Sequence, residues 1–357
     1  MTENATFPGT VCDILKVTAQ GRFAYMEEIM ASINDVAKRA HVAKSTVSLV
    51  VNNSGYVSEE TRKKVEKAIE ELNYQPSQLG RNLSNNRTDL IGVIIPDIAH
   101  PFFGTFVKYV EEALYKRGYK TVICATLERE NMEQEFLNML KRRAMDGIIM
   151  GAHSLLQEQY IKLTEPVVAF DRNLGNRIPL VQSDHKAGGR LAAEKLLESG
   201  CRRVVQVSGA RVVNTPAHEY HTAFEEAFAG EDTIVYNVTM PHNAFREKDF
   251  AEAAARVFQE YPDVDGIFGA DLVITACLQE ARRRKIPIPS KVKMIAYDGT
   301  SVTRQNERII DAVVQQIREL SYACAETMDQ LVRVGKAEEH RKVIPVLYQK
   351  GETVTEL

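Results

Sequence analysis

Short hydrogen-bonding and cationic side chains gather in the segment 44–49 of this sequence. Val47, Val50 and Val51 take the apolar positions of a helix, which leaves the other side chains of its first turns facing outward. This outward set consists of Lys44, Ser45, Thr46, Ser48 and Leu49. Cationic and hydroxyl-bearing side chains at the start of such a helix can reach base edges in the major groove of DNA. The chemistry predicted here is binding to double-stranded DNA rather than catalysis.

Carboxylates and an arginine follow two apolar segments that are typical of buried strands. Asp171 and Arg172 come directly after residues 167–170, and Asp271 comes shortly after residues 266–268. Ligands of parallel α/β sheets lie beyond the carboxyl ends of the strands, and a carboxylate can accept hydrogen bonds from two hydroxyl groups. We therefore predict that these three side chains bind a hydroxylated small molecule. Capping of a following helix is the alternative for both aspartates.

Aromatic residues after the first expected strand extend this candidate site. His100, Phe102 and Phe103 follow the apolar segment 90–96. Pockets for small molecules are lined mainly by apolar and aromatic side chains, and an aromatic ring can stack on the apolar face of a pyranose. A sugar is therefore a suitable ligand. Packing in the core is the alternative for Phe102.

The outward set needs two helices and a tight turn to position it. Apolar residues recur at helical spacing over 33–40, and a turn at residues 41–43 separates them from the helix that carries the outward set. Ser58 is a good N-cap for a third helix, which Pro76 then ends. This part of the chain is therefore predicted to be a helix-turn-helix followed by a third helix.

From residue 90 onward, short apolar strands alternate with amphipathic helices, which is the pattern of parallel βαβ units. The first lobe is expected to have strands over 90–96, 121–124, 147–150, 167–170 and 181–183 and helices over 102–117 and 132–142. The second lobe is expected to have helices over 187–197, 217–228, 250–261 and 272–284 and strands over 204–208, 234–238 and 266–268. Residues 292–297 and 312–316 then return toward the first lobe, whose last helix is expected over 320–334. The predicted fold class is α/β, with a small all-α headpiece and a two-lobed, doubly wound parallel-sheet domain.

Several short motifs together resemble the DNA-binding headpiece of the lactose and galactose repressor family. They are residues 34–37, 44–48, 50–52, 57–58, 61–62 and 72–76. The resemblance continues to about residue 350. It implies a periplasmic-binding-protein-like pair of lobes around a cleft, a homodimer on operator DNA, and a small-molecule effector, expected to be a sugar, that controls DNA binding. Within the family, residues 169–174 and 183–184 are most similar to sucrose-operon repressors.

The resemblance also implies roles at matching positions. Further DNA contacts implied in this way are Ser32, Asn34, Asn52, Tyr56, Ser58, Thr61, Tyr74 and Leu83. Leu83 matches the apolar wedge that enters a minor groove when the hinges of two copies meet. In the effector site Tyr220 and Gln316 match family positions, and the alternative for Gln316 is an amide bonded to the backbone.

Four positions depart from the family pattern. Ala43 stands where a serine usually caps the recognition helix. His41 stands in a turn usually held by glycine, and His is among the non-glycine residues enriched at positive φ. Leu49 replaces an arginine that often contacts guanine, so the operator should differ from that of arginine-bearing relatives. Tyr220 replaces a ligand-binding arginine, which favours a neutral saccharide such as sucrose or a related sugar over a phosphosugar.

The sequence divides into four segments. Residues 1–29 precede Met30, where translation is expected to begin, because the codons for residues 26–30 can spell a ribosome-binding site; a disordered arm is the alternative. The other segments are a headpiece over 30–75, a hinge helix or linker over 76–88, and a ligand-binding and dimerisation domain over 89–350.

Composition limits the classes of protein to which this chain can belong. The chain has 357 residues and a net charge of −3, and its cysteines are dispersed, odd in number and set among apolar neighbours, which indicates buried thiols in a reducing compartment. They are Cys12, Cys124, Cys201, Cys277 and Cys324. The sequence shows no signal peptide and no run of about 18 apolar residues, so we expect a cytoplasmic protein without a membrane partner.

Motifs of enzymes and of metal sites are missing from the sequence. It has no glycine-rich dinucleotide or phosphate loop, no nucleophile elbow and no histidine or cysteine cluster at metal spacing. We therefore expect no catalytic residue, no metal and no cofactor. A Rossmann-like enzyme or a transport sugar-binding protein is the alternative, and neither accounts for the headpiece. The sequence leaves open which sugar binds, whether it induces or corepresses, and whether a dimer or a tetramer forms.

Overall fold

The computed structural model describes residues 31–75, 87–127, 129, 131–152, 156–212 and 215–355. The chain forms two compact units, one that ends at Arg87 and one that begins at Thr88. The predicted extension over 1–29, and Leu83 in the predicted hinge, lie outside the described residues. In the described ranges no helix is both long and apolar enough to cross a membrane.

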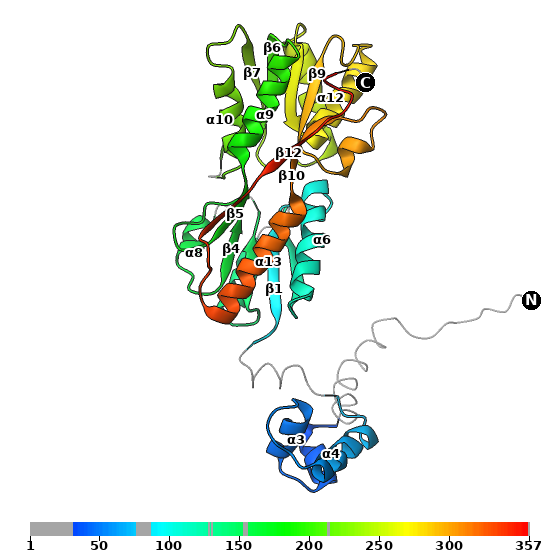
Figure 1. The fold of residues 1–357 in the computed structure, drawn as a ribbon, viewed down its shortest axis with the longest axis vertical. Coiled ribbons are helices and arrows are strands. Elements are labelled where there is room, and N and C mark those ends of the chain that lie inside the picture. Colours follow the sequence, from blue (N-terminus) through cyan, green and yellow to red (C-terminus); the bar gives the residue numbers. More distant parts are fainter. Residues whose placement is uncertain are drawn as a thin grey trace, which may run out of the picture. The chain divides into compact units, whose positions relative to one another are not determined.

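The described residues of the first unit form the helices α2 (Ile33–Ala40), α3 (Lys44–Val51) and α4 (Glu59–Glu71), as the sequence predicts (Figure 1). Helices as short as α2 and α3 are marginal in isolation, so the apolar side chains that they bury against α4 hold them in place. The core of this headpiece consists of Val36, Ala37, Ala40, Val47, Val50, Val65, Ala68 and Tyr74.

Local capping explains where the first two helices begin and end. The Ser32 N–H donates to Asp35 Oδ2 at 2.9 Å, and the Asp35 N–H donates to Ser32 Oγ at 3.4 Å, which is a capping box. His41 ends α2 with a φ of 56°, so the predicted positive-φ turn is confirmed. Ala43 gives α3 no side-chain cap, because it carries no acceptor atom.

The first lobe of the second unit is built on a six-stranded parallel sheet in the order β11-β5-β4-β3-β1-β2. Its strands are β1 (Leu90–Ile95), β2 (Lys120–Ala125), β3 (Gly147–Met150), β4 (Val167–Phe170), β5 (Leu180–Ser183) and β11 (Arg341–Ile344). Helices α6 (Pro101–Tyr115) and α13 (Ile317–Val334) pack on one face of this sheet. Helices α7 (Met132–Lys141) and α8 (Gln157–Ile161) pack on the other. Successive residues of a strand point to opposite faces, so both faces receive apolar side chains from β1.

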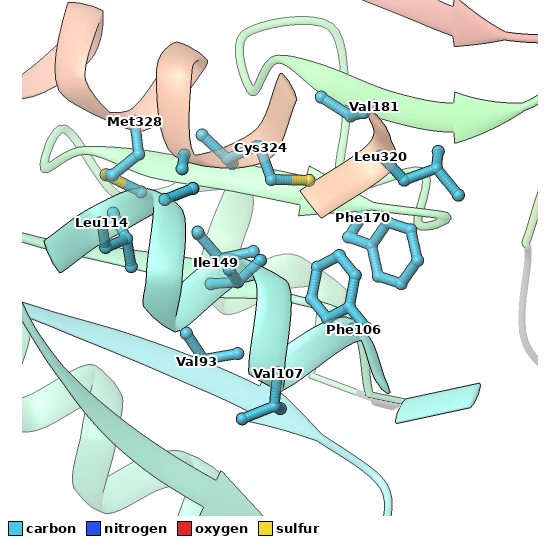
Figure 2. Packing of buried hydrophobic residues seen from close by; sticks show 14 of the residues in the cluster. Val93, Phe106, Val107, Leu114, Ile149, Phe170, Val181, Leu320, Cys324 and Met328 are labelled. Atoms are coloured by element: carbon cyan, nitrogen blue, oxygen red, sulfur yellow. The ribbon is translucent and has the colours of Figure 1, made fainter. Parts of the chain in front are cut away.

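The core under α6 and α13 fixes the strand end that leads into the candidate effector site (Figure 2). Phe106 of α6 stacks on Phe170 of β4, with ring centroids 4.0 Å apart. Cys324 and Met328 of α13 belong to the same buried cluster. Because Phe170 is the last residue of β4, this packing holds the start of the loop that carries the candidate ligand residues.

The second lobe is built on another six-stranded sheet, in the order β12-β10-β9-β8-β6-β7, in which only β12 runs antiparallel to its neighbour. Its strands are β6 (Arg203–Gly209), β7 (Ile234–Met240), β8 (Gly266–Ala270), β9 (Lys293–Asp298), β10 (Asp311–Gln315) and β12 (Val346–Gln349). Helices α9 (His185–Glu198) and α10 (His218–Ala227) pack on one face. Helices α11 (Glu247–Glu260) and α12 (Asp271–Arg283) pack on the other.

The chain passes between the lobes after β5, after β10 and between β11 and β12 (Figure 1). We predicted that residues 292–297 and 312–316 return toward the first lobe, but the structure places both segments in the second sheet, as β9 and β10. The return begins only with α13. Strands β11 and β12 and helix α8 were not predicted.

Candidate functional site

The first turn of α3 borders a shallow groove on the surface of the headpiece. Residues that line this groove include Asn34, Lys38, His41, Ala43 and Lys44. The N-terminal end of a helix carries a partial positive charge that attracts phosphate groups. The groove thus joins two cationic side chains, an amide and a helix N-terminus on one surface. Such a surface can hold a DNA backbone while exposed side chains of α3 meet base edges.

Lys44 differs from other cations of the headpiece in its charge environment. Arg39 Nη2 lies 2.5 Å from Glu71 Oε2, and Lys63 Nζ lies 3.6 Å from Glu59 Oε1. Within the described ranges, no carboxylate forms an ion pair with Lys44, whose side chain is exposed. Its charge is therefore available to a phosphate or a base edge.

Other predicted DNA contacts are distributed over the surface of the headpiece. Tyr56 is 93% exposed, and Asn34, Ser45 and Asn52 are exposed as well. Asn52 Nδ2 donates to Ser48 Oγ at 3.2 Å, which fixes both side chains on the end of α3. The partly buried candidates on α3 are Thr46, Ser48 and Leu49.

The remaining candidates have structural partners inside the headpiece. Ser58 Oγ accepts from the Thr61 N–H at 3.3 Å and lies 2.8 Å from Thr61 Oγ1, so this pair caps α4. Ser32 caps α2, as described above. Tyr74 is only 9% exposed and packs in the headpiece core, and its contact with DNA stays a prediction.

A cavity of about 230 Å³ lies where the two lobes of the second unit meet. We call it the interlobe cavity. It brings together these candidates: His100, Phe102, Asp171, Arg172 and Tyr220. His100 and Phe102 lie at the start of α6 and Tyr220 lies on α10, so the walls come from both lobes.

A chain of hydrogen bonds crosses the floor of the interlobe cavity. His185 Nε2 lies 2.8 Å from Asp171 Oδ1, and His185 Nδ1 lies 2.7 Å from the hydroxyl oxygen of Tyr297. The carboxylate can only accept, so Nε2 carries the proton and the Tyr297 hydroxyl donates to Nδ1. The Tyr297 ring also stacks on Tyr220, with centroids 3.9 Å apart. Asp171 in the first lobe is thereby tied to the second.

A second chain of hydrogen bonds runs through Asp298. Gln315 Nε2 donates to Asp298 Oδ1 at 2.7 Å, and Ser183 Oγ donates to Gln315 Oε1 at 2.6 Å. Burial raises the pKa of Asp298 well above its ordinary value, and the nearby Asp271 carboxylate adds to this effect. Asp171 and Asp298 also share a positive φ, of 47° and 111°. Such backbone strain is often found at binding sites, where the surrounding fold maintains it.

The structure corrects two predicted ligand residues. Asp271 does not line the interlobe cavity; its carboxylate accepts from the N–H groups of Gly299 and Thr300, at 3.0 and 2.6 Å, and from the Thr300 hydroxyl at 2.6 Å. It therefore holds the loop after β9. Gln316 also lies outside the lining, and its Nε2 donates to the Pro345 carbonyl at 2.9 Å.

The neighbouring strand ends supply the residues that the sequence analysis missed. Asp298 ends β9 and Gln315 ends β10, and both line the cavity. The rule that ligands lie beyond strand ends applies to Asp298 as well as to Asp171, so Asp298 could have been predicted from the sequence. His185 was missed because its helix was expected to begin two residues later.

Histidines give the interlobe cavity neutral donors and acceptors. Burial lowers the pKa of His100 to about 4 and that of His221 to about 3. Burial also lowers the pKa of His218, which lines the same cavity. These imidazoles are therefore uncharged near neutral pH and suit hydroxyl groups of a ligand.

Arg172 contributes a positive charge to the lining of the interlobe cavity. Only 3% of its surface is exposed, and burial lowers its pKa from 12.5 to about 10. Among the described residues, none accepts a hydrogen bond from its Nη1 or Nη2. A buried guanidinium without an acceptor is unfavourable, which indicates that a ligand oxygen completes the site.

The described residues contain no group of three or more His, Cys, Asp or Glu side chains that could hold a metal ion. The cysteines that can be described are Cys124, Cys201, Cys277 and Cys324, and all are free and buried, as predicted.

Comparison with known proteins supports both parts of this description. Residues 32–77 match the bacterial regulatory proteins of the lacI family, and residues 88–352 match the periplasmic binding proteins and sugar binding domain of the LacI family. The sucrose operon repressor of Streptococcus mutans is 33% identical over 91% of this chain and 100% of its own length. The ribose operon repressor of Halalkalibacterium halodurans is 34% identical over 91% of this chain and 97% of its own length.

Solved structures agree in fold. The structure of the lac repressor dimer bound to operator and the anti-inducer ONPF superposes with a TM-score of 0.79 at 20% identity, covering 92% of this chain and 100% of that one. The matched families are those of regulators rather than enzymes. With a helix-turn-helix headpiece, two doubly wound lobes and a cavity between them, this chain belongs to the lacI family of bacterial regulatory proteins.

Proposed function

We propose that this protein represses a carbohydrate-utilisation operon and that a small neutral sugar, bound in the interlobe cavity, sets its affinity for operator DNA. The observation that carries the proposal is the pairing of an exposed recognition helix with a cavity whose two carboxyl groups, Asp171 and Asp298, come from opposite lobes. A ligand that touches both lobes has different affinities for their different arrangements, so it shifts the equilibrium between them.

The size of the cavity favours a single-ring sugar over sucrose. Its volume of about 230 Å³ lies below the roughly 300–1,000 Å³ of sites for drug-sized ligands. Tyr220, Tyr297 and Phe245 are bulky aromatic residues in its lining. Relatives named for ribose and for sucrose are equally similar to this chain, so their names alone do not select the sugar.

The proposed DNA contacts follow from the exposed part of α3. Lys44 and Ser45, which are exposed, would read bases, and Leu49 would offer at most an apolar contact to a thymine methyl. One headpiece reads only a half-site, so the proposal includes a homodimer on a two-fold symmetric operator. Leu83 would act in the hinge of each copy.

The test uses the full chain. Purified protein is mixed with fragmented genomic DNA, the retained fragments are sequenced, and binding to the best fragment is measured with ribose, fructose or sucrose added. Lys44→Ala should weaken specific binding by about tenfold or more, because a side chain that contacts a base contributes about 1–3 kcal/mol. Lys63→Ala is the matched control, since Lys63 is equally cationic but already faces Glu59.

Two results would contradict the proposal. One is a protein that retains no fragment selectively, even at low salt without sugar. The other is equal loss of binding in the Lys44 and Lys63 variants, which would indicate a charge effect without readout. If one sugar changes the affinity for operator DNA, in either direction, the result would support the proposal that a sugar is the effector. The direction of the change would show whether that sugar induces or corepresses.

A further inference from the structure

A second cavity lies beside the interlobe cavity and differs from it in size and charge. Its volume is about 710 Å³, against about 230 Å³. Its walls come from the loop between β4 and β5, the start of α9, α10 and the start of β11. We call it the cationic cavity. We propose that it binds a phosphorylated sugar, whose phosphate group pairs with Arg172 and whose hydroxyl group meets Gln182.

Arg172 is the first reason for an anionic ligand. It lines both cavities, so its guanidinium stands in the wall between them. It is 3% exposed, and within the described part of the chain Nη1 and Nη2 have no hydrogen-bond acceptor. The neighbouring Asp171 carboxylate is engaged by His185 instead. The planar fork of an arginine matches two oxygens of one phosphate group.

Gln182 is an independent second reason. It lies on β5, is 2% exposed and lines the cationic cavity but not the interlobe cavity. Its Oε1 has no donor among the residues that the structure describes. A buried amide oxygen without a donor is costly, and a hydroxyl group of a ligand would supply the missing bond. An acceptor and a guanidinium in one cavity together fit an anion that also bears hydroxyl groups.

The side chains at the mouth of the cationic cavity are positively charged, as Arg172 is. Lys186 and Arg190 lie four residues apart on α9, so they share one face of that helix, and Arg341 begins β11. All three are exposed, and none forms an ion pair with a described carboxylate. Glu219 and Glu226 are the only carboxylates in the described lining of this cavity. The excess of positive charge attracts an anion toward Arg172.

Sharing Arg172 gives the second ligand a regulatory consequence. An anion in the cationic cavity would neutralise the guanidinium and alter the charge that a sugar in the interlobe cavity meets. The wall is also formed by both lobes, since the β4–β5 loop belongs to the first and α9 and α10 to the second. Binding at the two sites is therefore coupled, and the coupling must be reciprocal. This inference adds a ligand to the proposed function and does not depend on which neutral sugar occupies the first site.

The experiment is calorimetric titration of the full chain with glucose 6-phosphate, inorganic phosphate and glucose. Wild type should bind glucose 6-phosphate more tightly than inorganic phosphate, because only the former can use Gln182. The double variant Lys186→Gln, Arg190→Gln should weaken glucose 6-phosphate at least about fivefold. Lys195→Gln, on the same helix but outside the cavity and paired with Glu198, is the matched control and should bind as wild type does.

Gln182→Met keeps the size of the side chain and removes its amide. If the amide serves a ligand, glucose 6-phosphate binding weakens about tenfold while the melting temperature changes little, because the variant removes the unsatisfied Oε1 together with the 3.3 Å hydrogen bond that Nε2 donates to the Ser183 carbonyl. The proposal is overturned if neither phosphate compound binds, if the double variant binds as wild type does, or if glucose 6-phosphate is displaced competitively by a neutral sugar from the interlobe cavity. Each of these results leaves operator binding and neutral-sugar binding untouched, so the two proposals fail separately.

Discussion

Carboxyl groups at the ends of strands carry different roles in this protein, depending on their partners. Asp298 lines the interlobe cavity and meets one amide donor, Gln315, whereas Asp271 is surrounded by three donors from the loop after β9. Burial raises the pKa of Asp271 to about 6 in spite of these donors. Asp298 has fewer of them, and its carboxyl group therefore retains a proton well above the ordinary pH range of an aspartate.

The raised pKa of Asp298 predicts a dependence of stability on pH. A raised folded-state pKa stabilises the fold fully below the ordinary aspartate value, near 4, and this stabilisation is lost as the pH rises through the folded value. Asp298→Asn resembles the protonated form and tolerates a positive φ, so its melting temperature should exceed that of wild type at pH 8 and approach it near pH 4. Asp232→Asn, at an exposed position, is the control and should show no such trend. Parallel curves for wild type and Asp298→Asn would contradict this prediction.

At the residue scale, the site could be predicted in part. Asp171, Arg172 and Tyr220 line the cavity; the first two were expected there because they follow a strand, and Tyr220 because of the family resemblance. Asp271 and Gln316 were predicted to bind the ligand, but neither of them lines the cavity. Gln315 and Gln316 are adjacent, yet one lines the cavity and the other bonds to the backbone, because successive side chains at a strand end point in opposite directions.

At the scale of elements, clear patterns of apolar residues made most of the helices and strands predictable. Strands without such a pattern were missed. Strands β3 and β4 have their predicted bounds, since each is a continuous apolar segment buried on both faces. Strands β11 and β12 have only four residues each and are separated by Pro345. Their partners, β5 and β10, lie far away in the sequence, and no local pattern identifies such pairing.

The start of α3 allows a prediction about one element. Ala43 has the extended backbone of an N-cap residue, with φ of −69° and ψ of 150°, but no acceptor. Ala43→Thr should supply one and stabilise the helix by about 0.5–2 kcal/mol. Hydrogen exchange on the full chain should then show slower exchange of the amides of α3. Ala43→Val, which has the shape of threonine without the oxygen, should not slow exchange; equal protection in both variants would mean that packing, and not capping, is responsible.

At the scale of the whole second unit, two of the three crossings between lobes begin at residues that are hydrogen-bonded beside the interlobe cavity. Ser183 ends β5 just before the first crossing, and Gln315 ends β10 just before the second. Their mutual hydrogen bond joins the two crossing segments, and the bond of Gln315 to Asp298 ties them to the end of β9. Gln315, which lines the interlobe cavity, therefore also helps to hold one lobe against the other, which is the physical requirement for a ligand in that cavity to act at a distance.

This arrangement predicts that Gln315 transmits the effect of the sugar. Gln315→Leu removes the hydrogen bond to Ser183 between the crossing segments and the bond to Asp298, so sugar binding should change operator affinity at least about fivefold less than in wild type, while operator affinity without sugar stays within about twofold. The measurement is fluorescence anisotropy of labelled operator, with and without saturating sugar, after circular dichroism has confirmed folding. Gln316→Leu is the adjacent control, because it loses only the bond to Pro345 and lies outside the cavity. If both variants respond to sugar as wild type does, the coupling travels by another route; if both lose the response equally, disruption of the crossing itself, rather than the bonds of Gln315, explains the loss.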